Sequence, residues 1–334
     1  MEKFSQFRDK GSGISPFMPI KTPVSPLTYA LHTSLFLLRL PLFLTLTATY
    51  FLFLHHLPLP VVVRKALLWS LMAIPGLWWI DLQLDGVRRG TLADQPPSRF
   101  PHPASVIAST LTSPIDALYL AAIFDPIFTR AYPSTRKLER VSLLSAVAAA
   151  LGPVRQTPPP GATLYDLDAL LAAHPTRVIA VFPEAATTNG KAVLPLAPAL
   201  LAAPADADIF PVSLRYTPGD VTTPVPGRWL PFLWALLSRP TICIRVRVAE
   251  AVRNGPRAQT NGAHARHDDS DVTRRGGGAD GADGADVTME EQRVLDKVAE
   301  ALARLGRNKR VGLTLKDKAA FVDAWNRRTK VWLA

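Results

Sequence analysis

Residues 104–124 read ASVIASTLTSPIDALYLAAIF, a sequence that predicts one strand followed at once by one helix. The apolar segment Ala104–Ser109 has the length of a short buried strand. Ser113 is a favoured helix N-cap residue, Pro114 suits the first helical position, and mostly apolar residues continue to Phe124. A strand that leads directly into a helix is the repeating unit of an α/β fold.

Later residues extend this pattern. In Thr241–Ala249, apolar residues alternate with a second set that includes Arg245 and Arg247, as expected for a strand with one buried face. Pro211 lies inside another strand candidate, and because proline lacks an N–H we expect an edge strand or a bulge there. The other predicted elements are helices at Arg136–Leu151 and Thr163–Ala173 and strands at Thr176–Phe182 and Ile209–Tyr216. We therefore predict an α/β fold in which helices flank a sheet.

Apolar residues are concentrated before this region. Leu40–Leu54 carries no charge, and the run from Tyr29 to Val63 contains Arg39 as its only Lys, Arg, Asp or Glu. About 20 apolar residues are enough to cross a bilayer. A second uncharged run, Ala66–Ile80, follows a basic, proline-rich turn. We predict a retained membrane helical hairpin with both ends on the cytosolic side; the alternative is a buried hairpin of a soluble protein.

The C-terminal third has a different composition. Residues 253–287 contain three GAD repeats and no apolar period, which predicts a disordered insertion whose His and Asp residues are solvated and do not form a metal site. Thr288 and Glu291 have the spacing of a capping box, which predicts a helix to about Leu305. Basic residues outnumber acidic ones in residues 304–334, which suits an anionic membrane surface. We expect five segments: a polar N-terminal segment (1–28), a membrane anchor (29–97), an α/β domain (98–252), the insertion (253–287), and C-terminal helices with a basic tail (288–334).

Composition limits the class of protein. The chain has 334 residues and a net charge of +11, and 48% of its residues are hydrophobic while 19% are charged. These values argue against a mostly disordered chain. Cys243 is the only cysteine, so an intrachain disulfide and a cysteine-based zinc site are both excluded. No nucleic-acid-binding motif accompanies the positive charge, and we do not expect nucleic acid as a partner.

Two predicted strand-to-helix junctions carry polar residues in a defined order. The first, Thr110–Asp116, reads TLTSPID, and the second, Phe182–Lys191, reads FPEAATTNGK. With the later apolar segment Phe210–Tyr216, they resemble the motifs of the glycerolipid acyltransferases, which include the lysophosphatidic acid acyltransferases and a divergent fungal branch. The family's first motif is Asn-His-x-x-x-x-Asp and its third is Phe-Pro-Glu-Gly-Thr. The resemblance covers roughly Pro101–Val252 and implies the sheet with flanking helices of that family.

The resemblance also implies roles for single residues. In the family, the histidine takes a proton from the acceptor hydroxyl, which attacks the acyl-CoA thioester, and the aspartate orients the histidine. Asp116 matches the aspartate, whereas Leu111 stands at the histidine position. Other interpretations are that Asp116 is a helix N-terminal charge and that Glu184 holds loop amides. The implied substrate-binding residues are Thr112, Ser113, Arg130, Glu184, Thr187 and Lys191.

The function that this resemblance implies is acyl transfer from acyl-CoA to a lysophospholipid such as lysophosphatidic acid. We expect it at the endoplasmic reticulum membrane or the lipid-droplet surface, in contact with membrane lipids, with acyl-CoA as co-substrate and without a metal or a tightly bound cofactor. The alternative is a catalytically silent relative that binds lipid or protein on the membrane. Leu111 favours this alternative, whereas Asp116 and the Phe-Pro-Glu sequence favour the enzyme.

Overall fold

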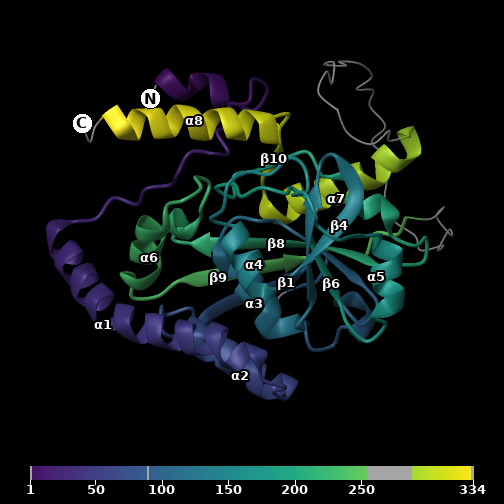
Figure 1. Cartoon of the computed structure of the whole chain (residues 1–334), viewed down its shortest axis with the longest axis horizontal. Helices are drawn as coiled ribbons and strands as arrows, with labels where there is room; N and C mark the ends of the chain where they lie inside the picture. The colour runs from purple at the N-terminus through teal and green to yellow at the C-terminus, as the bar shows by residue number, and fades with distance from the viewer. Residues whose placement is uncertain (1, 89, 255–287, 332–334) are drawn as a thin grey trace.

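The computed structural model describes residues 2–88, 90–254 and 288–331 and is built around one large sheet (Figure 1). The strands are β1 (Trp79–Leu84), β2 (Val106–Ser109), β3 (Ile127–Tyr132), β4 (Thr135–Val141), β5 (Leu164–Tyr165), β6 (Ile179–Phe182), β7 (Ala192–Val193), β8 (Ile209–Thr217), β9 (Cys243–Val248) and β10 (Lys309–Arg310). The α-helices are α1 (Pro26–Leu52), α2 (Val61–Ala73), α3 (Pro114–Phe124), α4 (Leu143–Ala149), α5 (Leu167–Ala173), α6 (Trp229–Leu237), α7 (Met289–Gly306) and α8 (Leu315–Val331). Short 3-10 helices are η1 (Glu2–Phe7), η2 (Leu54–His56), η3 (Pro97–Arg99), η4 (Pro198–Ala202) and η5 (Gly219–Val221).

Eight strands form the main sheet in the order β1-β9-β8-β2-β6-β3-β4-β5. The four central strands β8, β2, β6 and β3 are parallel, whereas β9 pairs antiparallel to β8 and β4 pairs antiparallel to β3. All residues of β2 and β6 are buried, as expected where helices cover both faces of a parallel sheet. One face packs against α1, α2, α3, α4 and α6, and the other packs against α5, α7 and η4. The predicted α/β sheet with flanking helices is therefore confirmed.

The predicted strand and helix at residues 104–124 are confirmed at nearly the expected bounds. Ser113 caps α3, since its hydroxyl accepts from the Ile115 amide, and Pro114 occupies the first turn. Asp116 completes a capping box with Ser113. The second predicted capping box, Thr288 with Glu291, opens α7. Both helices begin at local signals, which do not depend on the rest of the fold.

The prediction of one helix at Arg136–Leu151 is wrong. The first half of this segment lies in β4, which forms a hairpin with β3, and the helix α4 begins only after its N-cap residue Ser142. Leu138 is fully buried between polar neighbours, because β4 alternates its side chains across the sheet. The predicted helix at Thr163–Ala173 likewise begins later, at Leu167, after the short strand β5.

Pro211 does not lie in an edge strand, because β8 pairs with both β2 and β9. The predicted irregularity is present beside it. Ile209 pairs with Val252, and Val212 pairs with Val248. The two residues of β8 between these pairs therefore face three residues, 249–251, of the segment that follows β9. This bulge lies next to Pro211, whose missing N–H would otherwise be needed by a regular ladder.

The predicted membrane hairpin is only partly present. Within the described ranges, one helix, extended to His56, is long and apolar enough to cross a membrane, and it contains α1. The second apolar run, Ala66–Ile80, is divided: α2 ends at Ala73, and Trp79 begins β1, which pairs with β9. Gly76 permits this change of direction with a φ of +83°, and a Cβ there would lie 2.5 Å from the Pro240 carbonyl oxygen.

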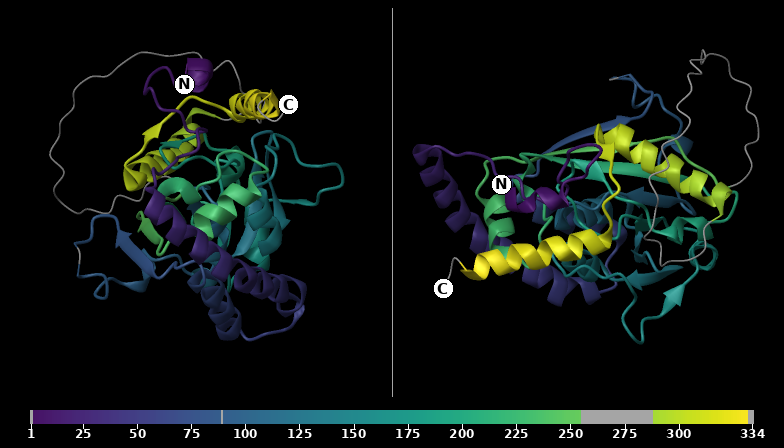
Figure 2. Two further views of the ribbon diagram at one scale, coloured as in Figure 1. Left: turned by 90° about the vertical axis from the view of Figure 1, so that its left-hand side faces the viewer. Right: turned by 90° about the horizontal axis from the view of Figure 1, so that it is seen from above.

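The α/β body also uses residues outside the expected range 98–252. β1 comes from the segment expected as a membrane anchor, and Arg64 of α2 forms an ion pair with Asp125 at the end of α3. At the other end of the chain, α7 packs on the sheet and α8 packs on the polar N-terminal segment, where Phe4 and Phe321 have ring centroids 5.5 Å apart (Figure 2). The expected disordered insertion, apart from residues 253 and 254, lies outside the described residues.

Candidate functional site

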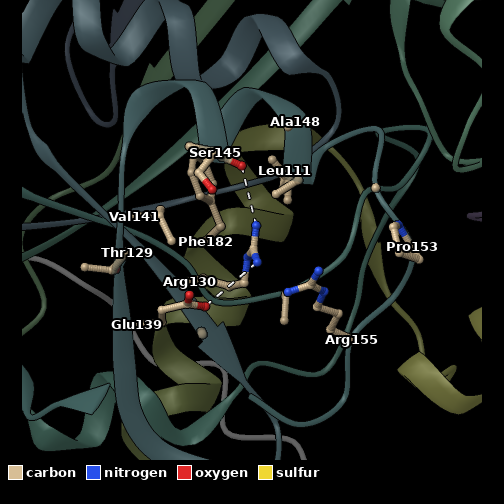
Figure 3. Close-up of a pocket in the computed structure, with 15 residues that line it drawn as sticks. Leu111, Thr129, Arg130, Glu139, Val141, Ser145, Ala148, Pro153, Arg155 and Phe182 are labelled. Carbon is tan, nitrogen blue, oxygen red and sulfur yellow. Dashed lines mark hydrogen bonds and ion pairs between the residues drawn. The ribbon is translucent and has the colours of Figure 1, made fainter. Parts of the chain in front are cut away.

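The carboxyl ends of the central parallel strands meet at one edge of the sheet. The chain leaves β2 toward Leu111 and leaves β6 toward Ala185 at this edge. Ligands of open α/β sheets bind outside the carboxyl ends of the strands. A cavity of about 360 Å³ lies here, between these strand ends, the β3–β4 hairpin and α4 (Figure 3). The topology therefore brings the two sequence motifs to the wall of one cavity.

Arg130, one of the substrate-binding residues that the resemblance implies, lies at this cavity. Its side chain lies in the cavity wall, where Nη2 donates to the Ser145 carbonyl oxygen at 3.4 Å (Figure 3). Nη1 lies 3.8 Å from Glu139 Oε2, and that carboxylate also accepts from the Tyr132 hydroxyl. These contacts orient the guanidinium and leave part of it exposed to the cavity.

A second guanidinium lines the cavity, and sequence reasoning missed it. Arg155, on the loop after α4, points into the cavity beside Arg130 (Figure 3). Its side chain is exposed and forms no ion pair with the described residues. With Glu139 as the single acidic residue in the wall, the two arginines give the cavity a net charge of +1. The arrangement suits an anion such as a phosphate.

Asp116 lies behind the cavity wall and is fully buried. Its Oδ2 accepts from the Thr112 amide at 2.6 Å, the Ser113 amide at 2.9 Å and the Thr112 hydroxyl at 3.1 Å, and its Oδ1 accepts from the Tyr216 hydroxyl. Burial raises the pKa of the Asp116 carboxyl to about 6, while these hydrogen bonds lower it. Both oxygens are therefore engaged in shaping the junction between β2 and α3.

We expect Asp116→Ala to lower the free energy of unfolding by about 2 kcal/mol. The substitution removes the capping box and leaves the Tyr216 hydroxyl and the Thr112 and Ser113 amides buried without their acceptor. Chemical denaturation of the purified protein in detergent measures this change. The control is Asp168→Ala, in the exposed first turn of α5, for which we expect less than about 0.5 kcal/mol. Equal stability of the two variants would contradict the structural role of Asp116.

The expected substrate contacts Thr112 and Ser113 do not line the cavity. Both are buried, and the Ser113 hydroxyl donates to the Val221 carbonyl oxygen at 2.9 Å. Lys191 is exposed and is also absent from the cavity wall. Of the predicted site residues, Leu111 and Arg130 line the cavity directly.

Glu184 and Thr187 belong to a second buried cluster, which is formed by the segment after β6 and by α8. Glu184 Oε2 accepts from the Leu194 amide at 3.1 Å, so this residue does hold a loop amide. Lys318 of α8 enters the cluster, where its Nζ donates to the Thr187 carbonyl oxygen at 2.6 Å and to the Thr187 hydroxyl at 2.8 Å. Both Glu184 and Lys318 are about 1% exposed. Sequence reasoning placed Lys318 in a basic tail suited to an anionic membrane surface and so missed it.

The whole chain is similar to a protein of Schizosaccharomyces pombe. That protein is described as a "putative lysophosphatidic acid:oleoyl-CoA acyltransferase" and is 28% identical over 339 aligned positions, which cover 98% of this chain and 99% of the relative. No family model and no solved structure matches the chain. The similarity includes the N-terminal and C-terminal segments as well as the sheet.

The cavity contains no histidine from the described ranges. His102 lies at the opposite end of the central strands, where its Nε2 is 3.3 Å from Asp208 Oδ2. The other described histidines are His32, His55, His56 and His174, in α1, in η2 and at the end of α5. Leu111 itself is a buried apolar residue of the cavity wall. The described part of the chain therefore offers no imidazole base at this site.

The described residues contain no group of three or more His, Cys, Asp or Glu that could hold a metal ion. The His and Asp residues between positions 264 and 271, which we expect to be solvated, lie outside the described ranges. The cavity wall itself combines the guanidinium groups of Arg130 and Arg155 with apolar side chains, an arrangement that suits an anion.

Proposed function

We propose that the protein transfers an acyl group from acyl-CoA to a lysophospholipid whose headgroup is a phosphate, such as lysophosphatidic acid. The observation that carries the proposal is the pair of guanidinium groups, Arg130 and Arg155, in one cavity at the carboxyl ends of the parallel strands. The name of the relative from S. pombe supports the same reaction. We further propose that the reaction takes place at the endoplasmic reticulum membrane or at lipid droplets, with α1 in contact with lipid.

In this reaction the acceptor hydroxyl oxygen attacks the carbonyl carbon of the thioester. The new C–O bond forms, the C–S bond breaks, and the hydroxyl proton ends on the sulfur of the released CoA. Arg130 and Arg155 hold the phosphate of the acceptor, and the apolar wall around Leu111 and Phe182 lies next to the acyl chain. With leucine in place of a base, the rate depends chiefly on how well the two substrates are placed.

The direct test is release of CoA thiol by the purified protein with oleoyl-CoA and a series of acceptors. We expect release with lysophosphatidic acid and much less with lysophosphatidylcholine or monoacylglycerol. The second candidate function, a catalytically silent lipid-binding relative, is favoured by Leu111 and predicts no release with any acceptor. In that case the protein should still bind lysophosphatidic acid, measured by calorimetry.

We expect Leu111→His to raise the rate of acyl transfer roughly tenfold or more. A general base at this position would take the hydroxyl proton, a contribution of about 10²- to 10⁴-fold in favourable sites. Asp116→Ala should cancel the gain, because the new imidazole would lose the aspartate that the acyltransferase motif pairs with its histidine. The control is Leu111→Asn, which introduces a polar group of similar size without a base. If the wild type is already fast and Leu111→His has no effect, another base performs the step.

A further inference from the structure

The cavity wall contains a residue in a strained backbone conformation. Ala185, in the segment after β6, has a φ of +54°. In this left-handed region a Cβ crowds the following carbonyl oxygen, so a residue other than glycine stays there only where the surrounding structure holds it. The Ala185 amide donates to the Phe182 carbonyl oxygen at 3.1 Å, which closes a tight turn at the end of β6. This turn therefore depends on support from the rest of the fold.

Hydrogen bonds to the body of the fold support one side of this turn. The Thr188 amide donates to the Leu111 carbonyl oxygen at 3.1 Å. The Thr187 hydroxyl donates to the Thr223 carbonyl oxygen at 2.7 Å, and the Thr223 amide donates to the Thr112 carbonyl oxygen at 2.8 Å. The turn is thereby connected to the junction between β2 and α3, whose Leu111 lies in the same cavity wall.

Lys318 supports the other side of the turn from α8. Its Nζ donates to the carbonyl oxygen of Thr187 at 2.6 Å and to the Thr187 hydroxyl at 2.8 Å. One ammonium group therefore fixes both the peptide plane and the side-chain rotamer of Thr187, two positions after Ala185. Both Lys318 and Thr187 are buried, so bulk water does not compete for these hydrogen bonds.

The N-terminal segment holds the far end of the turn. Asn189 Nδ2 donates to the carbonyl oxygens of Ser15 at 2.8 Å and Met18 at 2.9 Å. The Asn189 amide donates to the Pro16 carbonyl oxygen at 2.8 Å. The N-terminal segment and α8 pack against each other and lie side by side (Figures 1 and 2). Segments from both ends of the chain therefore contact the turn in the cavity wall.

The attachment of α8 does not by itself require a lysine. Leu315 and Phe321, three residues to either side of Lys318, are buried with it and supply apolar contacts. A buried ammonium loses its hydration, a cost that is offset only where hydrogen-bond acceptors meet it. Here the acceptors belong to the strained turn, which points to a role of Lys318 at the turn beyond the attachment of α8.

We propose that Lys318 is a positioning residue of the candidate site. Through Thr187 it holds the turn that places Ala185 and Leu111 in the cavity wall. The inference rests on the proposed acyl transfer, in which this wall lies next to the acyl chain. A displacement of about 1 Å can change an enzymatic rate about 100-fold.

A positioning role has a kinetic signature. Arg130 and Arg155, which hold the phosphate in the proposed reaction, belong to β3 and to the loop after α4. Loss of Lys318 should therefore leave phosphate binding in place and disturb the placement of the acyl group. We expect kcat to fall while KM for lysophosphatidic acid is retained.

The first experiment measures CoA thiol release from oleoyl-CoA and lysophosphatidic acid by Lys318→Met, well below the melting temperature of each variant. We expect kcat to fall at least about tenfold, while KM for lysophosphatidic acid changes less than about twofold. The matched control is Phe321→Leu, which weakens the ring contacts of α8 with Phe4 and Phe7 and should lower the melting temperature comparably. Its kcat should fall less than about twofold. An equal fall in both variants would show that Lys318 only fastens α8 and would overturn the proposal.

The second experiment repeats the substitution in the Ala185→Gly background. Glycine adopts a positive φ without the steric cost, so the turn keeps its conformation with less support from Lys318. We expect Lys318→Met to lower kcat by less than about threefold relative to Ala185→Gly alone. An undiminished tenfold effect would contradict coupling between Lys318 and the strained residue, and the proposal would fail.

Thr187→Val tests the same contact if Lys318→Met does not fold. Valine has nearly the shape of threonine but lacks the hydroxyl that accepts from Lys318 and donates to Thr223. We expect kcat to fall at least about threefold, and Thr187→Ser, which keeps the hydroxyl, should restore most of this loss. A kcat of Thr187→Val equal to that of the wild type would also overturn the proposal.

Hydrogen exchange separates this inference from the proposed function, because it does not measure turnover. We expect Lys318→Met, but not Phe321→Leu, to speed exchange of the Thr188 amide at least about tenfold. Faster exchange together with a wild type that releases no CoA thiol would refute the proposed function alone. Unchanged exchange would overturn the inference even if the wild type is active.

Discussion

Arg130→Ala is expected to lower kcat/KM for lysophosphatidic acid about 100-fold, equivalent to about 2.7 kcal/mol of transition-state stabilisation. The substitution removes a charge-assisted contact to the phosphate and leaves the Glu139 carboxylate in the cavity wall without its cation, so that it repels the phosphate. Arg130→Lys should retain part of the activity, because a lysine keeps the charge but loses the planar fork. Steady-state kinetics of thiol release measure these values.

Arg155→Ala should cost less, about tenfold, because Arg155 is exposed and no described residue orients its guanidinium by an ion pair. The matched control is Arg140→Ala, an exposed arginine of β4 that does not line the cavity. Monoacylglycerol, which lacks a phosphate, should react equally poorly with wild type and both variants. Equal losses for the two acceptors would contradict phosphate recognition, and a rise in KM for oleoyl-CoA alone would assign the arginines to the phosphates of CoA.

The parts of the fold that the sequence predicted well are those with local signals. Ser113, Pro114 and Asp116 fix the start of α3 within a few residues, and Thr288 with Glu291 fixes the start of α7 in the same way. The segment after β3 has no such signal. Its strand β4 is formed because it pairs with β3, a contact that the residues of β4 do not encode by themselves. Alternation around Leu138 was the one available indication.

Only the part of the candidate site that lies at the ends of β2 and β6 could be predicted from the sequence. Parallel strands bring Leu111 and Ala185 to one edge of the sheet, so the two motifs had to meet. Arg155 comes from a loop, whose path is set by packing and not by periodicity. Lys318 was detectable in principle, because it is three residues from both Leu315 and Phe321 and therefore lies on the buried face of α8. Because it is charged and belongs to a basic segment, sequence reasoning did not assign it to that buried face.

Lys318→Met is expected to lower the free energy of unfolding by about 2 kcal/mol. The lysine donates to the carbonyl oxygen and the hydroxyl of Thr187, and a buried acceptor that loses its donor typically costs about 1–3 kcal/mol. Arg327→Met, at an exposed position of the same helix, is the control and should change stability little. A small effect of Lys318→Met would show that α8 is held by its aromatic contacts alone.

Lys318 and Glu184 as a pair should give stability an unusual dependence on pH. Burial raises the pKa of the Glu184 carboxyl to about 8, and burial lowers the pKa of the Lys318 ammonium to about 7. In the unfolded chain both groups have their ordinary values, so from about pH 5 to 10 the pair binds one proton, on lysine. In the folded protein it binds two protons below about pH 7, one between about pH 7 and 8, and none above about pH 8.

The free energy of unfolding rises with pH wherever the unfolded state binds more protons. From about pH 5 to 7 the folded pair binds one proton more, so stability falls; above about pH 8 it binds one fewer, so stability rises. We expect a minimum near pH 7–8 with slopes on the order of 1 kcal/mol per pH unit on both sides. The double variant Glu184→Gln/Lys318→Met, which cannot titrate here, provides the reference curve. Denaturation of both proteins at each pH tests the difference, and parallel curves would mean that Glu184 and Lys318 remain charged in the fold.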